Sequence, residues 1–220
     1  MAGTGAFIVL EGPDGAGKTT QARRLMAELG RRGLDPLLVR EPGQTPIGEK
    51  IRAILLDPAN EAMDARTELF LFMASRTQLC LDLIRPALAA GRIVLADRFL
   101  ASSAVYQGLA GGVGLDLVLE IGGVATGGVR ADLTIVLDID AEAAVERVAR
   151  SRVRDRVEQK DLAYHRKVCS GYREYVRAAR ARGEAVEVVT AAGGEDEVAA
   201  DVLRAAGPVI DRALAGGAAA

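Results

Sequence analysis

The eight residues from 12 to 19 constrain what this chain can fold into more than any other segment. They read GPDGAGKT and match the pattern G-x-x-x-x-G-K-[ST] at every fixed position. A short apolar run, residues 7–11, comes before them, and apolar residues at helical spacing come after them. The segment is therefore predicted to turn from a buried strand into a helix, the context in which this pattern binds phosphate groups.

The residue types of the segment suit that task. Glycines let the backbone fold around an anion with its N–H groups pointing inward, and the new helix adds the positive end of its dipole. We expect Lys18 to be exposed and to reach the β- and γ-phosphates, and Thr19 to offer its hydroxyl to Mg²⁺. The residues expected around the phosphates of ATP are Gly12, Pro13, Asp14, Gly15, Ala16, Gly17, Lys18, Thr19 and Thr20.

Apolar runs and helical patterns alternate along the rest of the chain. Strands are predicted at 7–11, 37–40, 93–96, 133–137 and 186–189. Helices are predicted at 18–29, 47–56, 64–90, 141–150, 162–182 and 195–214. Such alternation predicts an α/β fold, a central parallel sheet of about five strands flanked by helices on both faces. We expect one domain over residues 1–220, with a frayed tail at 213–220.

Composition excludes several classes of protein. The net charge of −2 and the pI near 5.6 argue against a nucleic-acid partner, which would favour a basic face. Cys80 and Cys169 are too far apart in sequence for a zinc or redox motif, and His165 is the single histidine. The chain shows neither a secretory signal nor an apolar stretch of about 18 residues, so we expect no membrane partner and a cytoplasmic location.

The phosphate-binding pattern specifies a nucleoside triphosphate but no reaction. A GTPase would show an N/T-K-x-D motif, which the sequence lacks. A small-molecule kinase needs a second anion site and a means of excluding water. Arg98 follows the predicted strand 93–97 at the end where parallel sheets place their ligands. The segment 150–160 carries four arginines in seven residues, and we interpret it as a lid whose Arg152 and Arg154 are catalytic; a solvated charged face is the alternative.

Four segments together resemble the thymidylate kinase family over nearly the whole chain. The first is the phosphate-binding segment itself, and the second, residues 40–43, reads REPG. The third, residues 97–108, reads DRFLASSAVYQG and resembles the family signature DRY-x-x-SS-x-x-YQG. The fourth, residues 155–158, reads DRVE and follows the arginine-rich stretch. Gly15 combined with arginines in the lid is similar to the bacterial branch of the family.

The resemblance implies a function and roles for individual residues. It implies ATP-dependent phosphorylation of dTMP to dTDP with Mg²⁺ held through Thr19 and Asp97, by a homodimer. Phe72 would stack on thymine, Arg76 would bind its exocyclic oxygen, and Tyr106 would pack against the deoxyribose. Arg98 would hold the acceptor phosphate and count, with Lys18 and Asp14, among the catalytic residues. The implied dTMP-binding set is Asp14, Glu41, Pro42, Phe72, Arg76, Arg98, Ser102, Ser103, Tyr106 and Gln107.

The resemblance also implies a cis bond between Glu41 and Pro42. The chain departs from the family pattern at Gln44, Phe99, Ala101 and Thr190. Another nucleoside or nucleotide kinase, including one broadened to dUMP, stays open as an alternative enzyme. A nucleotide-binding switch is the alternative outside catalysis, and the second anion site at Arg98 counts against it.

Overall fold

The computed structural model describes residues 5–150, 156–157 and 159–218 of the chain. Its centre is a five-stranded sheet in the order β2-β3-β1-β4-β5, in which every neighbouring pair is parallel. The strands are β1 (Ala6–Glu11), β2 (Leu37–Arg40), β3 (Ile93–Asp97), β4 (Leu133–Asp138) and β5 (Val186–Thr190). The predicted α/β class and all five predicted strands are confirmed.

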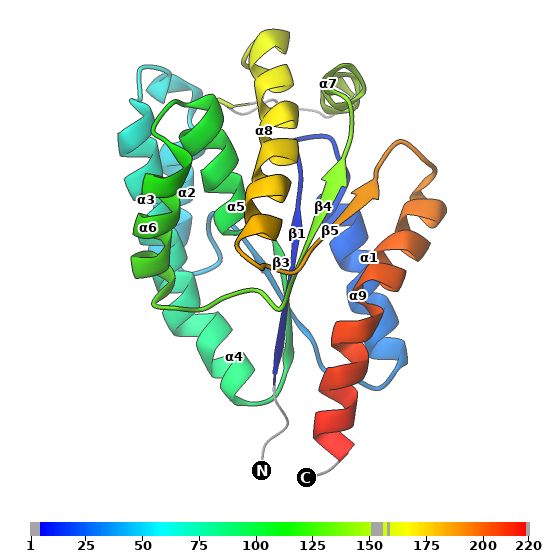
Figure 1. Ribbon diagram of the computed structural model, residues 1–220. Helices are drawn as coiled ribbons and strands as arrows, with labels where there is room; N and C mark the ends of the chain where they lie inside the picture. The colour runs from blue at the N-terminus through cyan, green and yellow to red at the C-terminus, as the bar shows by residue number, and fades with distance from the viewer. Residues whose placement is uncertain (1–4, 151–155, 158, 219–220) are drawn as a thin grey trace.

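Helices cover both faces of the sheet (Figure 1). On one side lie α1 (Lys18–Arg31) and α9 (Glu195–Ala218), which run beside each other. The remaining helices are α2 (Pro46–Leu56), α3 (Ala65–Leu79), α4 (Arg85–Ala89), α5 (Leu100–Ser103), α6 (Leu115–Thr126), α7 (Ala141–Ala149) and α8 (Leu162–Ala181). A short 3₁₀ turn, Pro58–Asn60, follows α2, and π-helical turns span Cys80–Ile84 and Ala104–Ala110.

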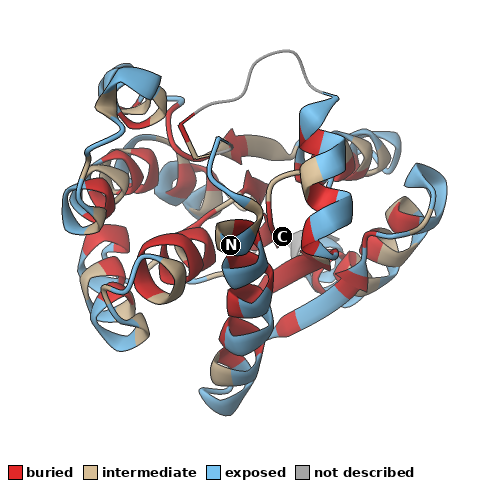
Figure 2. Cartoon of the chain, turned by 90° about the horizontal axis from the view of Figure 1, so that it is seen from above, coloured by how far each residue is buried: buried red, intermediate tan, exposed pale blue. Residues whose placement is uncertain are grey.

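The central strand β1 explains why the sheet needs helices on both sides. All six of its residues are buried. Ile8 and Leu10 join the apolar cluster beneath α1 and α9, whereas Phe7 and Val9 join a cluster on the opposite face with residues of the 80–87 region. Seen from above, the central strands and the inward faces of the helices are buried while the outward faces of the helices are exposed (Figure 2). A parallel strand covered on both faces is mostly apolar, and β1 is apolar up to its last residue, Glu11.

Three helix predictions need correction. The long pattern at 64–90 is not one regular helix, because a π-helical turn at Cys80–Ile84 separates α3 from α4. Helix α1 runs through Gly30 and ends before Gly33, whose φ of 78° suits only glycine well. Helix α9 includes Ala213 and ends at Ala218, so the expected tail does not begin at 213; alanine favours helix, and Ala213 packs against the core.

Helix α6 is absent from the sequence-based prediction. It contains Gly122 and Gly123 and ends at Gly127, and its apolar residues show little periodicity, so it resembles a loop. The structure gives one of these glycines a purpose: a Cβ on Gly122 would lie 2.2 Å from Leu100 Cδ1. Within the described residues, no helix combines the length and the apolar character needed to cross a membrane. Cys80 and Cys169 are both buried free thiols.

A substitution at Gly15 tests how tightly the loop after β1 packs. Gly15 has a φ of 81°, and a Cβ there would lie 2.3 Å from the carbonyl oxygen of Ala144 in α7. We expect Gly15→Ala to lower the free energy of unfolding by about 1–3 kcal/mol, because both backbone strain and overlap with a backbone atom add to the cost. Urea unfolding of Gly15→Ala beside Gly30→Ala is the measurement, since Gly30 lies in a helix with open space around it. Equal stability of the two variants would contradict the packing described here.

Candidate functional site

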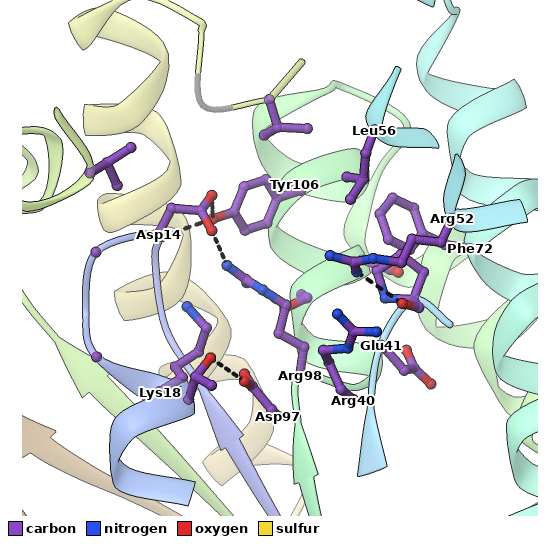
Figure 3. A pocket seen from close by; sticks show the side chains of 18 of the residues that line it. Asp14, Lys18, Arg40, Glu41, Arg52, Leu56, Phe72, Asp97, Arg98 and Tyr106 are labelled. Atoms are coloured by element: carbon purple, nitrogen blue, oxygen red, sulfur yellow. Dashed lines mark hydrogen bonds and ion pairs between the residues drawn. The ribbon is translucent and has the colours of Figure 1, made fainter. Parts of the chain in front are cut away.

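A cavity of about 560 Å³ opens at the carboxyl ends of β1, β2 and β3. Parallel strands end here together, as Leu10 and Arg40 both pair with Asp97 of β3 in register. Its lining includes fifteen of the predicted site residues: Asp14, Gly15, Gly17, Lys18, Thr19, Thr20, Glu41, Pro42, Phe72, Asp97, Arg98, Ser102, Ser103, Tyr106 and Gln107. Figure 3 shows Lys18 and Asp97 at one end of this cavity and Phe72 with Leu56 at the other.

Some predicted residues lie elsewhere. Gly12, Pro13 and Ala16 belong to the same loop but do not line the cavity, and Arg76 is buried behind it. Arg152 and Arg154 lie outside the described residues. The lining also contains residues that the sequence reasoning missed: Arg40, Arg52, Leu56, Glu68, Arg147, Val148 and Val157.

The loop from Gly12 to Gly17 forms the predicted turn between strand and helix. Gly12, Gly15 and Gly17 all have positive φ, and Gly17 caps the first turn of α1. Four backbone N–H groups at a helix N-terminus have no partner within the helix, so such an end attracts anions. The geometry matches the cradle that the motif predicts.

The prediction that Lys18 is exposed is wrong. Only 6% of the residue is exposed, and its Nζ donates a hydrogen bond to the carbonyl oxygen of Pro13 at 2.7 Å. The ammonium group thus lies inside the loop, where a carbonyl and nearby carboxylates replace water. Burial and the positive charge of Arg98 lower the pKa of Lys18 to about 8, although Asp14 and Asp97 oppose the shift.

Thr19 and Asp97 form the predicted pair of oxygen donors. The Thr19 hydroxyl donates to Asp97 Oδ2 at 2.5 Å, and Asp97 ends the buried strand β3. A hydroxyl and a carboxylate beside a phosphate-binding loop are the hard oxygen ligands that Mg²⁺ takes, with the rest supplied by water and phosphate. The described residues contain no cluster of three or more His, Cys, Asp or Glu side chains suited to hold a metal ion without such partners.

Asp14, Arg98 and Tyr106 connect the loop to the far wall of the cavity. Arg98 Nη2 is paired with Asp14 Oδ1, and the Tyr106 hydroxyl donates to Asp14 Oδ2 at 2.8 Å. The Arg98 guanidinium also lies 5.3 Å from the centre of the Tyr106 ring. Burial disfavours ionised Asp14, but Arg98 and Lys18 outweigh it and hold the pKa of Asp14 below its usual value. Burial and the negative charge of Asp14 raise the pKa of Tyr106 well above normal. The hydroxyl therefore stays protonated and acts as the donor in its hydrogen bond to Asp14.

The backbone of Arg98 is strained. Its φ is 74°, a left-handed conformation that costs a residue with a side chain about 1–2 kcal/mol. The buried carboxylate of Glu11 stabilises the turn that follows, because Glu11 Oε1 accepts hydrogen bonds from the backbone N–H of Phe99 at 2.8 Å and of Ser102 at 3.0 Å. Sequence reasoning missed Glu11; an acidic residue closing an otherwise apolar strand was the available signal.

Arg76 is held in a buried ion pair. Only 1% of it is exposed, its Nη2 lies 2.6 Å from Glu41 Oε2, and the same nitrogen donates to Ser103 Oγ at 3.1 Å. Burial raises the pKa of Glu41 to about 7, against the opposing charge of Arg76. The bond between Glu41 and Pro42 is cis, as expected. Arg76 therefore shapes the wall of the cavity from behind Ser103.

Gln107 and Glu68 form a second buried network at the same end. Gln107 Nε2 donates to Glu68 Oε1 at 2.5 Å, and Arg156 Nη2 pairs with Glu68 Oε2. The Oε1 atom of Gln107 is buried and has no hydrogen-bond partner among the described residues. Gln107 belongs to the lining of the cavity, so this unpaired acceptor lies at the cavity wall.

Two further arginines add positive charge here: Arg40, the first residue of the REPG segment, and Arg52, which contacts that segment. Arg52 of α2 lines the cavity and donates to the carbonyl oxygen of Pro42 at 2.9 Å, and Arg40 pairs with Glu49 at 3.2 Å. Gln44 stands at a φ of 65°, a conformation that glycine adopts more easily, and its side chain accepts a hydrogen bond from the Arg40 N–H at 2.7 Å. That hydrogen bond helps to offset the strain of having glutamine there.

The comparisons with known proteins agree on one family. A family model described as thymidylate kinase matches residues 10–202. A thymidylate kinase of Symbiobacterium thermophilum is 43% identical over 210 residues, covering 96% of each chain. A thymidylate kinase of Deinococcus radiodurans is 43% identical over 201 residues, covering 91% of this chain and 96% of that protein. Among solved structures, thymidylate kinase from Ehrlichia chaffeensis is 26% identical with a TM-score of 0.74, covering 91% of this chain and 97% of that one.

A substitution at Lys18 tests its buried position. Between about pH 8 and its unfolded value of 10.5, the unfolded chain binds more protons at Lys18 than the folded chain does, so stability rises with pH there. Below pH 8 the buried charge lowers stability by a constant amount. We therefore expect Lys18→Met to be at least as stable as the parent at pH 7, with its advantage shrinking towards pH 10. Thermal unfolding without nucleotide at both pH values measures this, with the exposed Lys167→Met as the control; a large loss of stability at pH 7 would contradict it.

Proposed function

Because this chain belongs to the thymidylate kinase family, we propose that the cavity is where it transfers a phosphoryl group from ATP to dTMP, forming ADP and dTDP. The observation that carries the proposal is the contact between Asp14 and Arg98. This contact brings a second cationic group next to the phosphate-binding loop, and both line one cavity. A nucleotide switch needs only the first of these sites, whereas a transfer between two phosphates needs both.

The loop end of the cavity is the donor site in this proposal. The N–H groups of residues 12–19 cradle the phosphates of ATP, and Lys18 leaves the Pro13 carbonyl to contact the β- and γ-phosphates. Thr19 and Asp97 would hold Mg²⁺, directly or through water. When bound there, Mg²⁺ would supply positive charge to neutralise the phosphates. Lys18 contributes its own positive charge from the phosphate-binding loop.

The acceptor phosphate lies between the loop and the REPG segment. Arg98 reaches this space from the end of β3, and Arg52 reaches it from α2 over Pro42. Guanidinium groups bind phosphate oxygens in pairs, so the two arginines can fix both the position and the orientation of the acceptor. Asp14, paired with Arg98, keeps that side chain pointed across the cavity.

The transfer itself needs no strong base. An ionised oxygen of the dTMP phosphate forms a bond to the γ-phosphorus of ATP, and the bond from that phosphorus to the β–γ bridging oxygen breaks. ADP leaves with the electron pair of the broken bond. Because the attacking oxygen is already deprotonated near neutral pH, the contribution of the protein is alignment and charge neutralisation. Arg152 and Arg154 stay predicted contributors, since they lie outside the described residues.

The opposite end of the cavity suits a thymine base. Phe72 offers a ring face for stacking, and the free Oε1 of Gln107 can accept the N3–H of thymine. Arg76 and Ser103 stand at the wall where the exocyclic O4 would lie, with Ser103 Oγ held by Arg76. Tyr106, fixed by Asp14, lies between base and phosphate and would disfavour a ribose 2′-hydroxyl.

An acceptor panel tests the proposal. With ATP as the donor, we expect dTMP to give the highest kcat/KM, dUMP to follow because it keeps the N3–H and O4 groups, and dCMP, AMP and GMP to be poor. The measurement is ADP release over a concentration series of each monophosphate. A faster reaction with AMP or GMP would exclude the proposed acceptor.

The same assay separates donor and acceptor sites. Arg98→Ala should raise the KM for dTMP at least tenfold and leave the KM for ATP within about threefold, because the lost contact is to the acceptor phosphate. Arg173→Ala is the matched control, since Arg173 pairs with Asp138 on the exposed side of α8. A variant that loses ATP affinity instead would assign Arg98 to the donor.

We also propose that two copies of the chain associate through α3 and α6. These helices pack against each other and present large exposed apolar side chains: Phe70 (59% exposed) on α3, and Leu117 (48%) and Val124 (80%) on α6. Leu81 (51%), in the π-helical turn that follows α3, is exposed as well. Exposed apolar side chains concentrated on neighbouring elements mark an association surface. The homodimer expected from the family resemblance would bury them.

Charge placed on this surface should separate the copies. We expect the parent chain to show twice the monomer mass and the double variant Phe70→Asp/Val124→Asp to show the monomer mass, because two buried carboxylates would oppose association. Light scattering at micromolar concentration measures both. Leu214→Asp, on an exposed side of α9, is the control that keeps the parental mass. If the parent chain showed the monomer mass, the proposed association through this surface would be contradicted.

A further inference from the structure

The amide group of Gln107 is held in one orientation by a side chain that can only accept. Glu68, when ionised, offers no proton, so the Gln107 group facing it at 2.5 Å must be the NH₂. The carbonyl oxygen then points the other way, and it is the buried atom without a partner among the described residues. A buried acceptor left unpaired destabilises a protein, so an atom of this kind indicates a ligand.

The position of the Glu68 carboxylate is fixed in turn by its ion pair with Arg156. Glu68 lies in the first turn of α3, where the helix dipole favours negative charge, but it is buried and needs a partner. Arg156 supplies that partner through Nη2, and it is itself buried and fixed by a hydrogen bond from its Nε to the Leu55 carbonyl oxygen at 3.0 Å. Arg156 therefore holds the Glu68 carboxylate where it accepts the hydrogen bond from the Gln107 NH₂.

We propose that Glu68 and Arg156 are positioning residues that determine which pyrimidine the enzyme accepts. Arg156 holds the Glu68 carboxylate in place, Glu68 keeps the Gln107 NH₂ turned away from the cavity, and the Gln107 carbonyl faces the ring N3 of the base. Thymine and uracil carry a hydrogen at N3 and satisfy that carbonyl. Cytosine carries a lone pair at N3, so two acceptors would face each other with no proton between them.

The inference rests on the proposed function, in which Gln107 contacts the base, and goes beyond it by assigning discrimination to residues that need not touch the base. Glu68 borders the cavity, but its Oε1 accepts a hydrogen bond from Gln107 and its Oε2 is paired with Arg156. Arg156 lies behind Glu68 and is not part of the lining. An effect of Arg156 on base choice must therefore pass through Glu68 and Gln107.

The test compares kcat and KM for dTMP and for dCMP in Glu68→Gln and Arg156→Met. Glu68→Gln keeps the shape of the side chain but offers both a donor and an acceptor, so it permits either orientation of the Gln107 amide. We expect kcat/KM for dTMP to fall about tenfold, mainly through KM, while kcat/KM for dCMP stays equal or rises, so that the ratio of the two falls at least tenfold. Arg156→Met should lower the ratio in the same direction, and Arg156→Lys, which keeps the charge, should restore part of it.

A purely structural role would lower the values for both acceptors together and leave their ratio unchanged, which would overturn the inference. Glu61→Gln and Arg31→Met, at exposed positions, are the matched controls and should keep the parental ratio. If Arg156→Met does not fold, Glu68→Gln and Arg156→Lys decide the matter.

Gln107→Leu separates this inference from the function on which it rests. If Gln107→Leu keeps the parental ratio, Gln107 does not contact the base, and both the base assignment and the inference fail. If Gln107→Leu loses the discrimination while Glu68→Gln and Arg156→Met keep it, the base assignment stands and the positioning role alone is overturned. Loss of discrimination in all three variants supports the inference.

Discussion

The carboxylate of Glu11 is the anchor on which the arrangement of this site depends. It lies fully buried at the end of β1 and accepts hydrogen bonds from the turn after β3 and from Ser102 Oγ at 2.6 Å and Tyr172 OH at 3.1 Å. The phosphate-binding loop begins at the next residue, and Arg98 comes just before the turn that Glu11 holds. The Glu11 carboxylate therefore fixes the position of the phosphate-binding loop relative to Arg98. Hydrogen bonds to a charged group are stronger than neutral ones, which suits an anchor that must hold a strained neighbour.

Two buried ion pairs give the base end of the cavity its shape. Arg76 with Glu41 connects α3 to the segment after β2, and Arg156 with Glu68 connects the start of α3 to the residues before α8. Replacing such pairs by apolar residues is often neutral for stability, so their value here is better sought in specificity. Each pair fixes a side chain that lines the cavity, Ser103 in the first case and Gln107 in the second. The orientation of these polar side chains in the cavity is thus fixed by buried ion pairs that lie behind the cavity wall.

The sequence could predict the site where a local pattern carries the chemistry. The loop from Gly12 follows from a short local motif, and Asp97 and Arg98 follow from their place at the end of an apolar strand. The cavity positions of Phe72 and Tyr106 were implied by the family resemblance. Arg52, Glu68 and Arg147 could not be found in this way, because each is one charged residue in an amphipathic helix. Only the packing of α2, α3 and α7 around the strand ends brings them to the cavity. The true position of Lys18 also depended on the folded loop, since its carbonyl and carboxylate neighbours replace water.

The sequence by itself determined the layers, the parallel sheet, the phosphate-binding turn and the family, because apolar periodicity and a short glycine motif are local properties. The sequence could not separate α3 from α4, and it could not predict α6, because the glycines of α6 are typical of a loop. Only the packing of Gly122 against Leu100 explains a glycine in that helix. Tertiary structure alone decided which charges pair. Glu68 is 39 residues from Gln107 and 88 from Arg156 along the chain, yet the three meet in one buried network. Pairings over such separations arise because burial makes an unpartnered charge costly, and which partner lies near depends on how every helix packs on the sheet.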